Sequence, residues 1–600
     1  MPTDTVPGLL FHEAARRGDR VAMRRKKLGI WQEISWTEYA EQARAVARGL
    51  MKLGVERGQC VAIASENRPE WITLDLGALA AGGVTVGVYT TNSVAECQYI
   101  VAHSESVVYV AEDEEQLDKA LAFRTETPSL RKIVLIDPKG LRQFADPMVM
   151  TFAELLDLGR KAEVQESDAL GRRLAEIRPD DVAIIVYTSG TTGPPKGAML
   201  SHRTILWTSE LIGQVEPTSP TDELLSYLPL SHVAQRTITV FNHIRHGYVV
   251  NFVENLDTFP QNLREVRPTQ FFGPPRVWEK FYSAVTLNVA EATAAKRLCY
   301  RLAVGVAMRR ARQRLARRPV GMGLELLYRL AYHTVLWRVR KHLGLDRVRF
   351  AFTGAAPISP DLLYFFHALG IPLREIYGQT ENCGPATMHQ GDDIVPGTVG
   401  RPFPGVEVRV ADDGEILLRG GNIFQGYFKN PQGTAETLKA GWLHTGDIGE
   451  LTPEGHLRIT DRKKDLISTG GGKNIAPQNI ENQLKFSPYI ADAVVIGDRR
   501  KYLTALVIVD EENCVRYAQD RRIPFATYAD LTRNPEIHRL IAQDVDRVNR
   551  TLARVETIKK FRILDKQLDP EDGDVTPTMK VKRKAISERY RHVIDEMYRD

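Results

Sequence analysis

Apolar and polar positions follow two different periods along the first part of the chain. Short runs rich in valine and isoleucine, flanked by turn residues, predict strands at 60–67, 83–89, 106–113 and 132–138. Across 36–54 the apolar residues recur at helical spacing and the run ends in glycine, which predicts a helix. Strands that alternate with helices favour stacked α/β layers.

The pattern changes in the later part of the chain. Residues 405–420 and 449–462 alternate around Asp-Gly or Glu-Gly and predict hairpins. Residues 492–510 predict two further strands joined by a basic turn, with helical segments after them. The change of pattern after the second hairpin predicts a domain boundary near 461–465.

Membrane-spanning and disulfide-rich classes are disfavoured. The most apolar stretch, 74–90, is rich in glycine and alanine and contains Asp75, so it predicts a buried helix and strand. The five cysteines are scattered without CxxC spacing, which argues against a disulfide framework or a zinc site. The first residues also lack the basic start and apolar run of a secretory signal, so we expect a cytoplasmic protein.

Positive charge is concentrated in one segment. Residues 296–349 contain fifteen Lys/Arg and two acids, Glu325 and Asp346. Within it, 296–318 and 324–344 predict two Arg-rich helices with apolar spacing. Such helices either lie on an anionic membrane or dock on the protein with their arginines in solvent, and both interpretations stay open. Nucleic-acid binding is disfavoured because no known reader motif accompanies the charge.

A glycine- and hydroxyl-rich stretch, 187–200 ("YTSGTTGPPKGAML"), follows the apolar run 182–186. Glycines let backbone N–H groups converge on an anion, and hydroxyls and a lysine add donors, which favours a polyphosphate ligand over a surface turn. Pro195 before the lysine and Gly197 after it exclude a Walker A loop. The candidate binding residues are Thr188, Ser189, Gly190, Thr191, Thr192 and Lys196.

This stretch resembles the phosphate loop of the adenylate-forming superfamily, which includes acyl-CoA synthetases, luciferases and peptide-synthetase adenylation domains. "FTGAAPISP" (352–360), "YGQTE" (377–381) and "GWLHTGDIGELTPEGHLRITDRKKDLI" (441–467) resemble further motifs of that family, in the family's order. The last one resembles the signature of fatty acyl-CoA synthetases nearly from end to end.

The resemblance spans roughly 37–584 and implies a fold and a domain plan. The fold class is α/β, with a large N-terminal adenylation domain of layered α/β subdomains and a β-barrel-like part at 1–460. A basic helical insertion lies at about 285–349, as in long-chain and very-long-chain enzymes. A hinge at 461–465 then leads to a small mobile α+β lid domain at 466–600.

The resemblance also implies roles for individual residues. Tyr377 would stack on adenine, Thr380 would reach the α-phosphate, and Asp447 would accept from the ribose hydroxyls. Chemistry agrees, since an aromatic face suits a purine and a carboxylate suits vicinal hydroxyls. Thr188 and Glu381 would hold Mg²⁺. The remaining nucleotide-binding positions are Gly354, Ala355, Ala356, Gly378, Gln379, Arg462 and Gly472.

The last motif, "VTPTMKVKRK" (575–584), resembles the loop that carries the catalytic lysine. We place that lysine at Lys580, where Met579 replaces the usual glycine, with Lys582 and Lys584 as competitors. The hinge residue would be Lys464, and "GGKNIAPQNIE" (471–481) resembles the loop that enters the site for thiol transfer.

The substrate prediction depends on "LPLSHVAQR" (228–236), which resembles the segment at the carboxylate end of the acyl pocket, with His232 at the aromatic position. Amino-acid activators generally place an Asp there, and this segment has none. We therefore predict a long-chain fatty acid–CoA ligase that uses ATP, Mg²⁺ and CoA. The alternatives are a fatty acyl-AMP ligase that loads a carrier protein, or an inactive acyl- or nucleotide-binding homologue.

Overall fold

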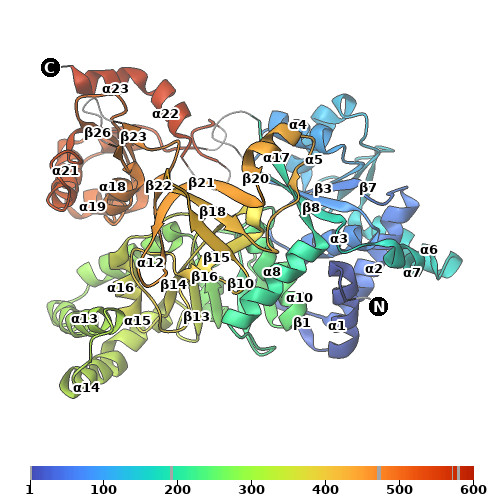
Figure 1. The fold of residues 1–600 in the computed structure, drawn as a ribbon, viewed down its shortest axis with the longest axis horizontal. Coiled ribbons are helices and arrows are strands. Elements are labelled where there is room, and N and C mark those ends of the chain that lie inside the picture. The colour runs from blue at the N-terminus through green and yellow to red at the C-terminus, as the bar shows by residue number, and fades with distance from the viewer. Residues whose placement is uncertain (1–2, 189–193, 469–473, 570–571, 577–580, 600) are drawn as a thin grey trace.

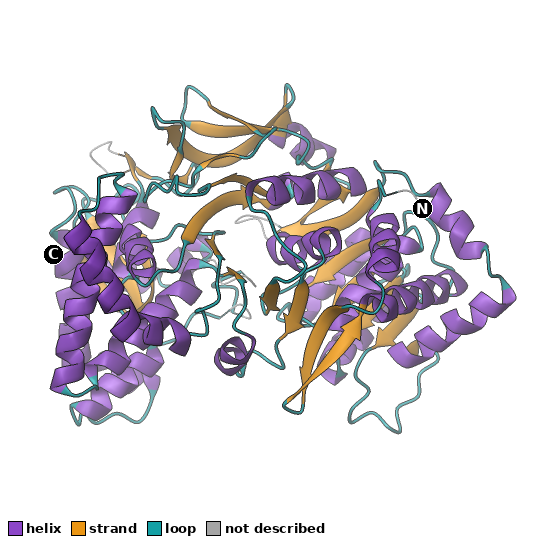
Figure 2. Ribbon diagram, turned by 90° about the horizontal axis from the view of Figure 1, so that it is seen from below, coloured by secondary structure: helices purple, strands orange, loops and turns teal. Residues whose placement is uncertain are grey.

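A computed structural model describes residues 3–188, 194–468, 474–569, 572–576 and 581–599. Layered sheets and helices fill the N-terminal part, and a smaller α/β part follows at the C-terminal end (Figure 1). In the view from below, helices gather at both sides of the molecule, and strands lie between them and along the upper edge (Figure 2).

One sheet has the strand order β19-β9-β8-β4-β3-β5-β6-β7. From β8 to β7 the neighbours are parallel, whereas β9 turns back against β8. The four strands predicted from the apolar runs are present here, which confirms that prediction. The strands are β3 (Cys60–Ala64), β4 (Val84–Val88), β5 (Val108–Ala111), β6 (Lys132–Leu135), β7 (Val149–Thr151), β8 (Val182–Thr188), β9 (Lys196–Ser201) and β19 (Gly426–Tyr427).

Helices cover this sheet, and the predicted helix at 36–54 is among them. It spans Trp36–Lys52 (α2), where Ser35 and Glu38 form a capping box that satisfies the first free amides. The other helices of this region are α1 (Val6–Arg17), α3 (Pro69–Ala80), α4 (Val94–Ser104), α5 (Glu114–Phe123), η1 (Arg124–Glu126), α6 (Phe152–Gln165), α7 (Ala169–Glu176) and α8 (His202–Val215).

A second sheet has the order β16-β15-β14-β13-β12-β10-β11-β1-β2. Its central strands are parallel. Two of the motifs, 352–360 and 377–381, begin near the carboxyl ends of β13 and β14. The strands are β1 (Val21–Lys27), β2 (Ile30–Ser35), β10 (Glu223–Ser226), β11 (Val249–Phe252), β12 (Gln270–Phe272), β13 (Phe350–Thr353), β14 (Leu373–Gln379), β15 (Gly384–Met388) and β16 (Arg401–Pro402).

Helices between these strands include the basic segment. The two predicted Arg-rich helices are confirmed: the first is α13 (Ala294–Leu315), and the second runs through α14 (Met322–Ala331), a π-helical turn η3 (Tyr332–Leu336) and α15 (Trp337–His342). The other helices are α9 (Val233–Arg236), the π-helical η2 (Thr237–Phe241), α10 (Asn242–His246), α11 (Phe259–Val266), α12 (Pro275–Ala290), α16 (Pro360–Ala368) and the 3₁₀ turn η4 (Thr380–Asn382).

Both predicted hairpins are present in a third sheet, of order β17-β18-β21-β20 with β22 paired to β21. The antiparallel pairs β17–β18 and β21–β22 enclose the expected turns. The elements are β17 (Glu407–Val410), β18 (Glu415–Arg419), α17 (Pro431–Thr437), β20 (Leu438–Lys439), β21 (Trp442–Leu451) and β22 (Leu457–Arg462).

The C-terminal part has its own sheet, β25-β26-β27, and a short pair, β23-β24. The two strands predicted at 492–510 are β25 and β26, and they pair antiparallel. The predicted domain limits at 461–465 stay a prediction. The elements are β23 (Ile467–Ser468), β24 (Asn474–Ile475), α18 (Pro477–Leu484), β25 (Ile490–Ile496), β26 (Leu503–Val509), α19 (Glu511–Asp520), α20 (Tyr528–Arg533), α21 (Pro535–Asn549), β27 (Ile558–Ile563), α22 (Arg583–Arg589) and α23 (Arg591–Tyr598).

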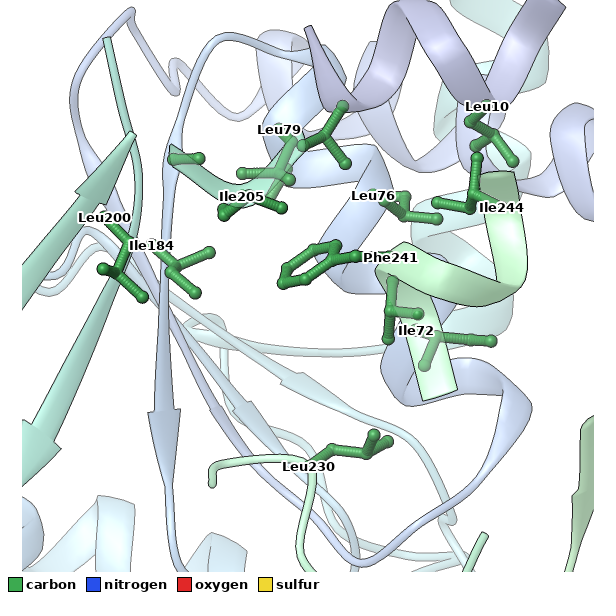
Figure 3. Close-up of a cluster of buried hydrophobic side chains, with 14 of the residues drawn as sticks. Leu10, Ile72, Leu76, Leu79, Ile184, Leu200, Ile205, Leu230, Phe241 and Ile244 are labelled. Atoms are coloured by element: carbon green, nitrogen blue, oxygen red, sulfur yellow. The ribbon is translucent and has the colours of Figure 1, made fainter. Parts of the chain in front are cut away.

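The core of the N-terminal part joins α1, α3, α10 and the first sheet. Phe241 lies among Leu76, Ile72 and Ile244 from neighbouring helices (Figure 3). A buried ion pair crosses this core: Arg236 donates from Nε to Asp75 at 3.0 Å and again from Nη2, and both side chains are fully buried. Asp75 of the apolar stretch is therefore a core residue with a partner 161 residues away.

Helix α12 connects the insertion to the C-terminal part. Arg276 donates a hydrogen bond to the carbonyl oxygen of Ala491. The rings of Tyr282 and Phe486 stack with their centroids 4.8 Å apart. We call these four residues the α12 seam.

All five cysteines are free thiols, as the sequence predicts, and four of them are buried. Within the described residues, no helix is long and apolar enough to cross a bilayer.

Candidate functional site

A cavity of about 1180 Å³ lies between the N-terminal sheets and the C-terminal part. It is lined by the β8–β9 hairpin, the ends of β13 and β14, and strands β21 and β22. Thr576 and Val581 line it from the C-terminal side. Segments far apart in sequence, including most of the motifs, therefore open on one space.

The phosphate-loop candidates begin at the end of β8. Thr188 lies opposite Lys196 in the hairpin register, and its hydroxyl donates to the Lys196 carbonyl oxygen at 3.4 Å. The Lys196 ammonium lies 5.0 Å from the centre of the Tyr427 ring. Ser189, Gly190, Thr191 and Thr192 lie outside the described residues.

Glu381 stands on the 3₁₀ turn η4, directly after β14. The Tyr427 hydroxyl donates to its Oε1 at 2.7 Å, and Phe424 N–H donates to its carbonyl oxygen at 2.9 Å. Burial and the nearby carboxylate raise the pKa of Tyr427, so the hydroxyl stays a donor. Glu381 and Lys196 thus meet on the same tyrosine.

The turn after β13 brings backbone to the cavity wall. A Cβ on Gly354 would meet the Ile376 carbonyl oxygen at 2.6 Å, so glycine is required for this close approach. Ala355 has φ +67°, in the left-handed region that non-glycine residues rarely adopt. Ala355 and Ala356 both line the cavity with small side chains.

Gly378, Gln379 and Thr380 join β14 to η4. A Cβ on Gly378 would lie 1.5 Å from the Gly384 carbonyl oxygen, which fixes glycine at this position. Gln379 N–H donates to the Asn382 side chain at 2.7 Å and begins the turn. Thr380 is nearly buried at the cavity edge.

Tyr377, Asp447 and Arg462 form one cluster. The Tyr377 hydroxyl donates to Asp447 Oδ2 at 2.7 Å, and Arg462 Nε lies 3.5 Å from Asp447 Oδ1. Asp447 and Arg462 are also register partners on β21 and β22. The structure therefore brings these three predicted residues together in the cavity.

His232 caps the short helix α9 and lines the same cavity. Its Nδ1 accepts from Ala234 N–H at 3.2 Å, so a neutral ring carries its proton on Nε2. Part of the lining of the same cavity is apolar. These apolar residues come from α8, η2, β15 and the following loops: Ile212, Ile238, Met388, Val399 and Phe403.

The predicted hinge follows β22. Lys464 lines the cavity with an exposed side chain, and partial desolvation together with Arg462 lowers its pKa. Asp461 precedes it, and burial raises the pKa of its carboxyl to about 6. Its Oδ2 accepts from Gln478 N–H at 3.3 Å, which joins the hinge to α18.

Lys580 and Gly472 lie outside the described residues. The described neighbours of the first, Thr576 and Val581, line the cavity. Arg583 also lines it but donates twice to Glu481, at 2.6 and 2.7 Å. The competitors Lys582 and Lys584 are not among the residues that line the cavity, and Lys584 is exposed.

Two cavity residues were missed by the sequence reasoning. Glu375 is 6% exposed, its Oε1 has no hydrogen-bond partner among the described residues, and burial raises the pKa of its carboxyl to about 8. It lies two positions before Tyr377 on β14, so the strand period could have placed it on the same side. Tyr427 was missed because a lone aromatic carries no recognisable signal.

No cluster of three or more His, Cys, Asp or Glu side chains suited to a metal occurs within the described ranges. Mg²⁺ binds through one or two carboxylates together with substrate phosphates, so a single carboxylate beside a phosphate loop fits it. Glu381 has that place, and Thr188 lines the same cavity.

Comparison with protein families gives two matches. Residues 10–428 match the family described as AMP-binding enzyme, and residues 464–600 match the AMP-binding enzyme C-terminal domain.

Curated relatives match along the whole chain. Long-chain-fatty-acid–CoA ligase ACSBG2 of Xenopus laevis is 34% identical, with 100% of this chain and 84% of the relative covered. Long-chain-fatty-acid–CoA ligase FadD15 of Mycobacterium tuberculosis is 35% identical, with 99% and 97% covered.

Solved structures share the fold at lower identity. The adenylation domain of a carboxylate reductase from Mycobacterium chelonae gives a TM-score of 0.75 at 23% identity, over 99% of this chain and 91% of that one. ATP-bound MatB from Rhodopseudomonas palustris gives 0.70 at 22%, over 98% and 99%. These likenesses confirm the predicted fold class.

Proposed function

Since the chain belongs to the AMP-binding enzyme family, we propose that it is a long-chain fatty acid–CoA ligase. A carboxylate oxygen of the acid attacks the α-phosphorus of ATP, and the bond to pyrophosphate breaks, which gives acyl-AMP. The CoA thiol then loses its proton and attacks the acyl carbon, and AMP leaves. Relatives named long-chain-fatty-acid–CoA ligases, matched over nearly the full chain, support this assignment.

The observation that carries the proposal is the shared cavity. Thr188 and Lys196 line it from the phosphate-loop hairpin, and Thr576 and Val581 line it from the segment that contains Lys580. A triphosphate in this space would meet donors from both parts of the chain. Adenylation needs positioning and charge neutralisation more than a protein nucleophile, and such an arrangement provides both.

We assign the nucleotide's base and sugar to the β13, β14 and β21 side. The small Ala355 and Ala356, which follow the close approach of Gly354 to Ile376, offer a flat surface, and Tyr377 offers an aromatic face. Asp447 would accept from ribose hydroxyls beside Arg462. Glu375 presents an acid with an unpartnered oxygen to the same wall, which suits the exocyclic amino group of adenine.

Several residues would neutralise the negative charge of the ATP phosphates. Lys196, the loop 188–193 and Thr380 would bind phosphate oxygens. Glu381 and Thr188 would hold Mg²⁺, which neutralises charge on the phosphates when bound. The Tyr427 hydroxyl fixes one Glu381 oxygen and so orients the carboxylate.

Lys580 is the proposed catalytic residue, and it would offset charge on the α-phosphate and on the attacking carboxylate. Absence of Lys582 and Lys584 from the cavity lining favours this choice over the two competitors.

The acid would bind beyond His232. His232 lines the cavity together with apolar residues, among them Ile212, Ile238 and Phe403, which offer surface to an alkyl chain. No carboxylate of the segment 228–236 is available to pair an α-ammonium group. A long-chain acid fits this chemistry better than an amino acid.

For thioester formation we propose that residues 466–600 form a lid. This lid would rotate about Lys464, within the hinge at 461–465. The segment 471–481, with Gly472, would then approach the site and admit the pantetheine arm of CoA. The basic insertion of about 285–349 is proposed as a peripheral membrane contact, since long-chain acids partition into bilayers.

The test is a two-stage assay of the purified protein with ATP, Mg²⁺, palmitate and CoA. We expect pyrophosphate release and palmitoyl-CoA. Acyl-AMP without any CoA ester would indicate carrier-protein loading instead, and no adenylation with acids of any length would contradict the proposal.

A matched set of lysine variants tests the residue assignment. Lys580→Ala should lower the adenylation rate by about 10²- to 10³-fold while ATP still binds. Lys582→Ala and Lys584→Ala serve as controls and should keep most activity. The reverse pattern would transfer the role to one of them.

A further inference from the structure

Helices α13 and α14 expose an unusual concentration of large apolar side chains. Fifteen such side chains are exposed in the described part of the chain, and seven of them lie within the span from 298 to 337. The other eight are scattered from Leu28 to Val555. The seven are Leu298, Leu302, Met322, Leu326, Leu327, Leu330 and Trp337. A concentration of this kind marks an interaction surface.

Three of these side chains form a stripe along α14. Met322, Leu326 and Leu330 recur every four residues and are 92%, 70% and 63% exposed. Residues with this spacing share one face of a helix. Tyr328 and Ala331 are buried on another face and dock α14 on the protein. Helix α14 thus has a second apolar face that the fold does not cover.

The surroundings of the stripe carry unneutralised positive charge. Arg310 pairs with Glu325, and Arg314 pairs with Asp392. Six further exposed cations of this segment have no carboxylate within ion-pair distance among the described residues. They are Lys296, Arg301, Arg309, Arg318, Arg338 and Lys341.

The position of α13 and α14 in the molecule favours a large, flat binding partner. Helices α13 and α14 lie at an outer end of the molecule, far from the N-terminal helices α1 to α3 (Figure 1). An outer helix pair of this kind can meet a surface without moving the rest of the fold.

We propose that α13 and α14 dock the protein on an anionic lipid bilayer. The stripe Met322, Leu326, Leu330 enters the interfacial region, and the six cations lie at the level of the headgroups. Apolar insertion and attraction of each cation to acidic lipids act together. A second copy of the chain is a poorer occupant, because face-to-face stripes would bring two sets of unneutralised cations together.

The role of this surface rests on the proposed function in one respect. A ligase for long-chain acids gains access to a substrate dissolved in the bilayer. Binding to lipid is nevertheless a separate property, so the two proposals can fail independently.

Flotation with two kinds of vesicle tests the surface. The probes are vesicles of phosphatidylcholine alone and vesicles of equal parts phosphatidylcholine and phosphatidylglycerol. The wild-type protein should float with the second kind and much less with the first, and added salt should release it. Leu326→Glu with Leu330→Glu should lower the partition coefficient by about tenfold or more.

A charge-matched control changes two exposed apolar residues outside the insertion. Val164 and Leu256 are 88% and 57% exposed, so Val164→Glu with Leu256→Glu adds the same charge elsewhere. This control should float like the wild type. A thermal melt checks that both double variants are folded.

Three outcomes would overturn the proposal. The first is a wild-type protein that does not float with anionic vesicles, and the second is a stripe variant that floats as well as the wild type. The third is a dimer in light scattering that the stripe variant dissociates, which would assign the face to a second copy. Adenylation of palmitate supplied in detergent should be equal in all variants, and absence of adenylation in every protein with acids of any length would instead contradict the ligase proposal.

Discussion

Two buried carboxyl groups, Asp75 in the N-terminal core and Glu375 in the cavity wall, have opposite surroundings. Asp75 receives two hydrogen bonds from Arg236, and both side chains are fully buried. Glu375 is almost as deeply buried, but its Oε1 has no partner among the described residues, and it lines the cavity. A buried charge neutralised by the chain holds structure together, whereas a buried acid without a partner at a cavity indicates a place for a ligand.

The largest effect should come from separating the core pair. Arg236→Met leaves Asp75 buried without a counter-charge, and such a change costs about 3–5 kcal/mol of unfolding free energy. Urea denaturation measures it. The double change Arg236→Met with Asp75→Leu removes both charges and should restore most of the loss. A double variant no more stable than Arg236→Met would show that the pair acts through packing rather than charge.

The next effect concerns the pH dependence of stability at Glu375. Its pKa is raised by burial from an ordinary 4.5 to about 8. Below 4.5 both folded and unfolded chains hold the proton, and above 8 both release it. Between these limits the unfolded chain ionises first, so stability should fall by about 1.4 kcal/mol per pH unit.

Glu375→Gln removes this titration and provides the control. The difference in unfolding free energy between wild type and variant should change steadily through that pH window and be level outside it. Parallel stability curves would mean that the Glu375 carboxyl is hydrated or partnered in solution.

A smaller effect is expected on nucleotide binding. A carboxylic acid and an amide both offer an acceptor beside a donor, so Glu375→Gln should keep ATP affinity. Glu375→Leu removes the hydrogen bonds and should raise the dissociation constant for ATP by about tenfold. Isothermal titration compares them. Equal affinity in the two variants would exclude contact between Glu375 and the base.

The smallest effect tests Asp447, a carboxylate that is partly satisfied by the chain. Tyr377→Phe removes the 2.7 Å hydrogen bond to Asp447 but keeps the aromatic face. The hydroxyl only orients the carboxylate, so about 1 kcal/mol of this hydrogen bond should appear in ATP binding, and the KM for ATP should rise about threefold to fivefold with kcat unchanged. A fall in kcat with an unchanged KM would assign the hydroxyl to the chemical step.

The same two carboxyls show how far the sequence could lead. Asp75 argued against a membrane span at 74–90, yet its partner Arg236 lies 161 residues away at the end of the motif segment 228–236. No local pattern predicts that these two residues pair. The alternation of strand and helix, both hairpins and the two basic helices follow local periods and were predicted. Which distant segments share a core depends on tertiary packing, which one sequence does not display.

Some residues of the site could likewise be located from the sequence, and others could not. Motifs located Tyr377, Asp447 and Arg462, and the structure brings them together. Glu375 escaped because an acid near a strand end is ordinarily a solvated residue, and burial is invisible without the fold. The assignments of Lys580, Gly472 and the loop residues 189–192 stay predictions, since they lie outside the described residues.

The α12 seam sets a scale for any swing of the C-terminal part. If that part turns as a rigid unit, the rings of Tyr282 and Phe486, now 4.8 Å apart, must separate and take up water. An aromatic pair contributes about 0.5–1.5 kcal/mol beyond the area it buries. A contact of that strength favours the present orientation of the C-terminal part when the enzyme is at rest. It is still weak enough for thermal motion to break it many times within one slow catalytic cycle.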